Sequence, residues 1–296
     1  MMYLDEFQHY LADTKSASQN TIISYTRDIE RFCDFILKQG CASPLYADSD
    51  MIKKYMNFLE LSGRSPSTTT RSLASLRSFY QYMILAHGMA ENPARAIRPQ
   101  KVQKKLPQVL TGAEIELLLS QPATAELKGC RDKAMLELLY ATGIRVSELI
   151  NLNVEDINLE VGVLCCHGTK SERVIPIYPT AVAAIADYMA RARSVLLSID
   201  TDNALFINLN GQRMTRQGFW KLVKTYAAGA SIHKDITPHT LRHSFASHLL
   251  ENGAHLKDLQ EILGHADISS TKVYAKVLQE RFKSVYNNCH PRAKRA

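Results

Sequence analysis

Residues 237–274 read TPHTLRHSFASHLLENGAHLKDLQEILGHADISSTKVY, and the rest of the chain is organised around them. Thr237 is a good capping residue and Pro238 suits the first helical position, so a helix is predicted to begin here. His239 then lies in the first turn, where free backbone N–H groups favour an anion. Arg242 follows three residues later on the same face, and together the two side chains suit a phosphate oxygen.

The second half of this stretch adds two more candidates. Gly264 is predicted to end another helix, His265 follows it directly, and Tyr274 lies nine residues further on. Two histidines, an arginine and a tyrosine around one anion would form a site for chemistry on a phosphodiester. Each also has an ordinary interpretation, because a helical His and Arg are usually structural or solvated and a single Tyr usually belongs to a core. The remainder of the chain must therefore show whether these four residues form a site for phosphodiester chemistry.

Length and composition indicate a soluble protein of two domains. The chain has 296 residues, 46% of them hydrophobic and 22% charged, with a net charge of +7 and a pI near 9.0. The excess of basic residues favours a polyanionic partner, although many basic proteins bind none. No signal peptide, membrane-spanning run or CxxC pair is found, so the sequence predicts a reduced cytoplasmic protein with free thiols, no membrane contact, no metal and no cofactor.

Residues 1–98 are predicted to form a small bundle of four helices. Apolar residues recur at helical spacing at Leu4, Phe7 and Leu11, and again from about residue 21 to 36. A third helix is expected at about 50–61 and a fourth at about 67–86. Short loops between helices are typical of such a bundle.

Three arginines of this segment are candidates for DNA contact. Arg64, Arg71 and Arg77 lie within residues 61–90, which contain no acidic residue and many serines and threonines. Arginine with small hydroxyl side chains is a combination that contacts the phosphate backbone. A solvated helix face explains the same pattern equally well.

Residues 99–108 are predicted to form a linker. The segment PQKVQKKLPQ has two prolines, three lysines and no acidic residue, a composition that discourages packing. A basic tether could follow a DNA backbone. Residues 109–296 then form the second domain, whose tail after Glu280 carries only basic charges.

Two further residues of the second domain are candidates for the site. Arg145 lies in ATGIRVSEL, at the predicted start of a helix, where its guanidinium could bind an anion or simply pair with Glu148. Lys170 lies in a turn between two strand-like runs within residues 154–177. A lysine in such a turn is usually solvated, but on a hairpin that reaches a site it could donate a proton.

Taken together, these residues resemble the tyrosine recombinase (phage integrase) family. The pattern consists of six residues in the family's order and context: Arg145, Lys170, His239, Arg242, His265 and Tyr274. The text at 18–28 and the ending His290-Pro-Arg-Ala resemble the Xer recombinases, and the resemblance covers essentially the whole chain. Many Xer proteins have Gly-Lys-Gly before the hairpin turn, where this chain has Cys166-His167-Gly168.

The resemblance implies a mainly α fold with a small β-hairpin or sheet. It implies an N-terminal four-helix, SAM-like core-binding domain and a C-terminal DNA breaking-rejoining catalytic domain. Its chemistry implies that Tyr274 attacks the scissile phosphate to give a 3′-phosphotyrosyl link, without metal or ATP. Arg145 and Arg242 would bind the non-bridging oxygens and His265 a phosphate oxygen. His239 would assist proton transfer from Tyr274, and Lys170 would protonate the leaving oxygen.

The resemblance also implies partners in a bacterial or archaeal cell. These are a double-stranded DNA recombination site, a homo- or hetero-tetramer of recombinases on two sites, and a septal DNA translocase as a candidate accessory protein. Two other classes share features of the sequence, a type IB topoisomerase and a DNA-binding protein without catalysis. The target site is not specified, nor is the choice between chromosome dimer resolution and movement of a genetic element.

Overall fold

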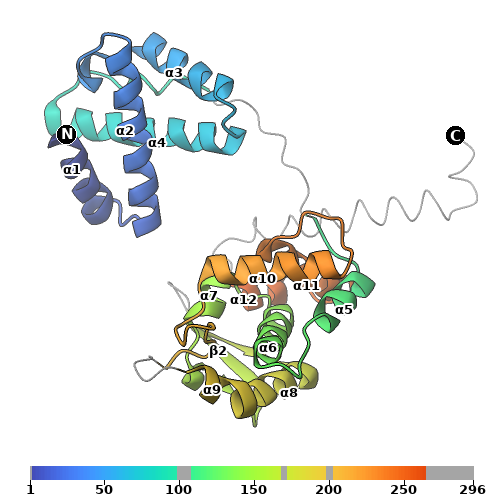
Figure 1. The fold of residues 1–296 in the computed structure, drawn as a ribbon. Coiled ribbons are helices and arrows are strands. Elements are labelled where there is room, and N and C mark those ends of the chain that lie inside the picture. Colours follow the sequence, from blue (N-terminus) through green and yellow to red (C-terminus); the bar gives the residue numbers. More distant parts are fainter. Residues whose placement is uncertain (1, 99–107, 168–171, 198–202, 265–296) are drawn as a thin grey trace, which may run out of the picture. The chain divides into compact units, whose positions relative to one another are not determined.

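The computed structural model describes residues 2–98, 108–167, 172–197 and 203–264. The chain divides into two compact units, Met1–Lys104 and Lys105–Ala296, and each is described by itself (Figure 1). The division falls within the interval predicted to be a linker, and residues 99–107 of that interval lie outside the described part. The linker bounds therefore stay a prediction.

The first unit is the predicted helical bundle. Its helices are α1 (Met2–His9), α2 (Gln19–Lys38), α3 (Ser49–Leu61) and α4 (Pro66–His87), with a π-helical turn η1 (Tyr10–Thr14) and a 3-10 turn η2 (Pro44–Tyr46). The side chains of Ser18, Asp48 and Ser65 cap α2, α3 and α4 by accepting from backbone N–H groups three residues on. These caps explain why the helices begin where they do.

Aromatic side chains fill the centre of this bundle. Helix α2 packs against both α1 and α4, and α3 packs against α4. Phe32 and Tyr55 meet edge to face with ring centroids 5.1 Å apart, and Phe7 and Phe79 do so at 5.3 Å. The bundle therefore has a hydrophobic core of its own.

The second unit is also mainly helical. Its elements are α5 (Gly112–Ser120), α6 (Leu127–Thr142), α7 (Val146–Asn151), η3 (Val154–Asp156), β1 (Ile157–Asn158), β2 (Val163–His167), β3 (Glu172–Pro176), α8 (Pro179–Asp187), η4 (Tyr188–Arg193), α9 (Ser194–Leu196), α10 (Arg216–Gly229), α11 (Pro238–Glu251) and α12 (Leu256–Leu263). Helices α8 and α9 are joined by η4, where the hydrogen bonding is π-helical.

Helix α6 is the central helix of this unit (Figure 1). It packs against α8, η4 and α11, and most of its residues are buried, as expected for a helix with neighbours on several sides. Its buried charges are paired. Arg131 binds Asp132 at 2.6 Å, and Glu137 accepts a hydrogen bond from Tyr178.

The three strands form one antiparallel sheet in the order β1-β2-β3. Leu164 lies opposite Ile175 and Cys166 opposite Arg173, and these four side chains point to the buried face. The predicted hairpin is thus present, and its inner face includes an arginine. Among the described residues, no helix is both long and apolar enough to cross a membrane.

Candidate active site

Arg145 stands immediately before α7 and is held by Glu148. Its backbone N–H donates to Glu148 Oε2 at 2.7 Å, and its Nη1 donates to Oε1 at 3.0 Å. The pairing three residues apart that the sequence allowed is therefore present. The Arg145 side chain is nevertheless 42% exposed, so it is anchored at one end and still reaches the surface.

Helix α11 begins as the sequence predicted. Thr237 accepts from the backbone of Thr240, and Pro238 occupies the first turn. His239 is exposed in that turn, whereas Arg242 is buried. Arg242 donates to the carbonyl of Gly143 at 2.5 Å and to that of Leu263 at 2.8 Å. His239 and Arg242 therefore share one face of α11, with His239 at the surface of the second unit and Arg242 in its interior.

Three arginines meet at the C-terminal end of α12. The carbonyls of residues 262, 263 and 264 accept from Arg173 at 2.9 Å, Arg242 at 2.8 Å and Arg145 at 3.5 Å, respectively. A helix leaves its last carbonyls without partners and carries negative partial charge at that end, which favours cations. The three arginines come from the start of α7, from β3 and from α11. Elements distant in sequence therefore join directly before position 265.

Glu148 links two of these arginines. Its Oε2 accepts from Arg173 Nη2 at 2.8 Å in addition to the Arg145 backbone, and its side chain is only 11% exposed. Desolvation raises the pKa of this carboxyl. The hydrogen bonds from Arg173 and Arg145 and their two charges outweigh that effect, so the pKa of Glu148 lies below its ordinary value. Glu148 therefore stays ionised at neutral pH.

His239 lies in the positive field of this cluster. Partial desolvation lowers its pKa first, and the charges of Arg242, Arg216 and Arg145 lower it further. The ring is consequently neutral at pH 7 and has a nitrogen able to accept a proton. Arg216, the first residue of α10, contributes to this field, and the sequence analysis did not single it out.

Three of the six predicted site residues are described, and they are brought together. Arg145, His239 and Arg242 lie in one region of the second unit. Lys170, His265 and Tyr274 lie outside the described residues, so their roles stay predictions. Within the described ranges, no group of three His, Cys, Asp or Glu side chains could hold a metal ion.

Arg173 is a site residue that the sequence analysis missed. The side chains of β3 alternate between exposed and buried, and Arg173 lies on the same buried face as Ile175. An arginine in the apolar phase of a strand is a signal that it has a specific buried partner. That signal was available, but the partners are 25 and 89 residues away in the sequence.

The three arginines proposed to contact DNA differ in their surroundings. Arg64 is exposed just before α4. Arg71 binds Asp28 Oδ2 at 2.6 Å and the carbonyl of Ser24 at 3.1 Å. Arg77 donates to the carbonyls of Ala94 and Ile97 and so fastens the segment after α4. DNA contact by Arg71 and Arg77 stays a prediction, and it would have to be shared with these internal bonds.

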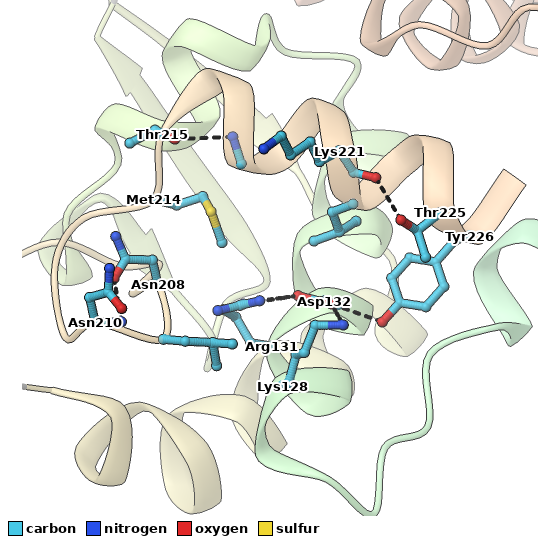
Figure 2. Close-up of a pocket in the computed structure, with 13 residues that line it drawn as sticks. Lys128, Arg131, Asp132, Asn208, Asn210, Met214, Thr215, Lys221, Thr225 and Tyr226 are labelled. Carbon is cyan, nitrogen blue, oxygen red and sulfur yellow. Dashed lines mark hydrogen bonds and ion pairs between the residues drawn. The ribbon is translucent and has the colours of Figure 1, made fainter.

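A pocket of about 360 Å³ lies between α6, α10 and the segment before α10 (Figure 2). Figure 2 shows Met214 lining it beside a polar group in which Asp132 accepts from Arg131 at 2.6 Å and from Tyr226 at 2.8 Å. Arg145, His239 and Arg242 do not line this pocket. Its polar groups bind one another, so the structure assigns it no part in the phosphate site.

Comparison with known proteins shows the family and the fold of the chain. The model of the Phage integrase family matches residues 108–281, and that of the Phage integrase, N-terminal SAM-like domain matches residues 4–87. Tyrosine recombinase XerD of Listeria innocua is 43% identical over 98% of this chain and 99% of its own length. The corresponding protein of Staphylococcus haemolyticus is 41% identical over 98% and 99%. The crystal structure of XerH site-specific recombinase bound to difH substrate has the same fold, with a TM-score of 0.71 and 21% identity over 92% of this chain and 80% of that one.

Proposed function

Because the chain belongs to the phage integrase family of tyrosine recombinases, we propose that it is a site-specific DNA recombinase of the Xer type. It cuts and rejoins DNA strands through a 3′-phosphotyrosyl intermediate. The observation that supports this proposal is the convergence of Arg145 and Arg242 at the end of α12, with His239 close enough that both charges lower its pKa. A covalent intermediate conserves the energy of the phosphodiester bond, so that rejoining needs no ATP.

The two arginines neutralise the charge that develops on the scissile phosphate. Arg145 is partly exposed and oriented by Glu148, and Arg242 is oriented by the carbonyls of Gly143 and Leu263. Guanidinium groups held in advance need no reorganisation when charge develops, which is why such groups lower the barrier effectively. The N-terminal turn of α11 adds its own positive partial charge.

His239 assists removal of the proton from the nucleophile. A tyrosine hydroxyl has an ordinary pKa of ~10 and attacks poorly without help. His239 is neutral at pH 7 because desolvation and three arginine charges lower its pKa. It can therefore accept a proton from Tyr274, while Lys170 protonates the leaving 5′-oxygen and His265 binds a phosphate oxygen. No metal or other cofactor takes part in these steps.

The partner is a double-stranded DNA recombination site. Four recombinase protomers assemble on two such sites, either identical or of two kinds, and a septal DNA translocase is the candidate activator. Both inferences follow from the resemblance of the chain to the Xer recombinases. The same resemblance supports a cytoplasmic location, and it leaves the choice between chromosome dimer resolution and movement of a genetic element unspecified.

The proposal is tested with a substrate nicked near the cleavage position. After attack the short strand diffuses away, and the covalent complex is trapped as an SDS-resistant band. Tyr274→Phe should bind the site as tightly as the unchanged protein and form no such band, whereas the control Tyr286→Phe should form it normally. A persistent band in Tyr274→Phe would remove Tyr274 as nucleophile.

A second measurement separates a recombinase from a type IB topoisomerase. The protein is incubated with two DNA molecules that each carry a recombination site. Exchange of flanking sequences between the two molecules is the expected result. Relaxation of supercoils without any exchanged product would instead indicate a topoisomerase.

A further inference from the structure

We propose that Arg173 is a positioning residue for DNA cleavage, which fixes Glu148, and through it Arg145, against the C-terminal end of α12. The inference rests on the proposed function, because Arg145 is taken to bind the scissile phosphate. It adds to that function a residue which touches no DNA and acts through two other side chains.

Arg173 is a buried charged residue. It lies on the buried face of β3, opposite Cys166, with a side chain only 8% exposed. A buried guanidinium is unfavourable unless its donors are well bonded. Here Nε donates to the carbonyl of Ile262 at 2.9 Å, and Nη2 donates to Glu148 at 2.8 Å. The planar guanidinium of Arg173 therefore bridges the Glu148 carboxylate and the C-terminal end of α12.

A chain of hydrogen bonds connects Arg173 to Arg145 through Glu148. Oε2 of Glu148 accepts from both, at 2.8 Å from Arg173 Nη2 and at 2.7 Å from the Arg145 backbone N–H. Oε1 accepts from Arg145 Nη1 at 3.0 Å. The Glu148 carboxylate therefore holds both the backbone and the guanidinium of Arg145 in place. Whatever moves Glu148 also moves the guanidinium that is to meet the phosphate.

Arg173 also contacts the end of α12. Gly264 has a φ of +62°, and a Cβ placed there would lie 2.7 Å from Arg173 Nη1. A residue with a Cβ would be strained in this left-handed backbone and would force the Arg173 guanidinium to shift. Arg173 is therefore packed directly on the residue that precedes His265 in the sequence. The same guanidinium fixes both the start of α7, through Glu148, and the end of α12.

A lysine cannot reproduce this arrangement. Arg173 uses two nitrogens of a rigid fork for two acceptors on different elements, whereas lysine has a single nitrogen on a flexible stem. Arg173→Lys keeps the charge and loses the geometry. A misplacement of about 1 Å at a catalytic group can slow a reaction on the order of 10²-fold.

The test is single-turnover cleavage of the nicked substrate at saturating protein, with binding affinity and melting temperature measured alongside. Arg173→Lys should bind DNA normally and cleave on the order of 10²-fold more slowly. Arg131→Lys is the matched control, because Arg131 is equally buried and pairs with Asp132 beside the pocket of Figure 2. That variant should lose stability and retain the cleavage rate wherever it is folded.

Two readouts distinguish positioning from general stability. A methylphosphonate at the scissile position replaces one charged oxygen by a neutral methyl group, so the reaction depends less on an arginine. Arg145→Ala and Arg173→Lys should both lose less rate on this substrate than on the phosphate. A double-mutant cycle of Arg173→Lys with Glu148→Gln should show a combined loss well below the product of the single losses.

The outcomes separate this inference from the proposed function. If Arg145→Ala is slow while Arg173→Lys cleaves at the unchanged rate, the positioning role is wrong and the proposed function stands. An equal loss on both substrates, with independent losses in the cycle, also overturns the positioning role. If Arg145→Ala itself cleaves normally, the proposed function fails first. Should Arg173→Lys not fold, Arg173→Gln, which retains one amide donor, takes its place in the same measurements.

Discussion

The guanidinium of Arg242 donates to the backbone carbonyl of Gly143 at 2.5 Å and so ties α11 to the segment that carries Arg145. Gly143 ends α6 with a φ of +59° and accommodates Phe245, whose Cδ1 would lie 2.2 Å from any Cβ at this position. Gly143 therefore ends the central helix α6 and orients Arg242. It also leads into the segment that carries Arg145, the other proposed phosphate ligand.

Gly143→Ala should destabilise the second unit and slow cleavage. The left-handed backbone costs about 1–2 kcal/mol for a residue with a Cβ, and the clash with Phe245 adds about 1–3 kcal/mol. Gly88→Ala is the control, because Gly88 ends α4 with nearly the same left-handed backbone, at φ +64°, but has open space around it. Thermal melting and cleavage rates check both variants. Equal losses in the two would mean that the contact with Phe245 relaxes freely.

Arg71→Ala should destabilise the first unit, more at pH 7 than at pH 4. Asp28 is 1% exposed, and burial raises its pKa, while the Arg71 charge opposes that shift. A carboxyl with a raised folded pKa contributes most below its unfolded pKa, and its contribution is lost as the pH rises through the folded value. Removing Arg71 raises the pKa of Asp28 further, so the loss should be about 1–3 kcal/mol at pH 7.

Denaturant unfolding at the two pH values measures this effect. Adding Asp28→Asn to Arg71→Ala should recover part of the stability and remove the difference between pH 4 and pH 7. A pH-independent loss in Arg71→Ala alone, or a pH dependence that persists after Asp28→Asn is added, would show that Asp28 is not the group responsible.

Arg64→Ala should flatten the salt dependence of DNA binding. Each phosphate neutralised contributes about −0.9 to the log–log slope, so loss of one contact should reduce the slope by about that amount. Arg64 is exposed beside the start of α4. Lys53→Ala is the control, because that lysine pairs with Asp50 at 2.8 Å and is already neutralised. Identical slopes for Arg64→Ala and the unchanged protein would remove Arg64 from the interface.

Lys170→Ala should cut cleavage by roughly the 10²–10⁴-fold typical of losing a general acid. The reason is that an alkoxide leaves poorly unless it is protonated. A substrate with sulfur at the bridging 5′ position leaves as a thiolate, and thiols are far more acidic, with a pKa of ~8.5 for cysteine. On that substrate Lys170→Ala should recover, whereas Arg145→Ala should not. If the sulfur substrate gives no recovery, Lys170 binds phosphate or is structural, and another group is the acid.

Local signals in the sequence determined much of this protein. Thr237 and Pro238 start α11, and Gly264 ends α12, both as predicted. These features depend on residues within one or two turns of each other, so the sequence displays them directly. The helical bundle and the hairpin follow from apolar periodicity in the same way.

Only the tertiary structure decided which side chains share partners. Glu148 looked like a simple neighbour of Arg145, yet it also binds Arg173, and Arg173 reaches Ile262 across 89 residues. Arg71 looked like part of a free basic face but is paired with Asp28, 43 residues away. Such bonds depend on how helices and strands pack, which no local pattern encodes. The sequence therefore identified residues suited to binding a phosphate, and the packing of α7, β3, α11 and α12 brought the described ones together.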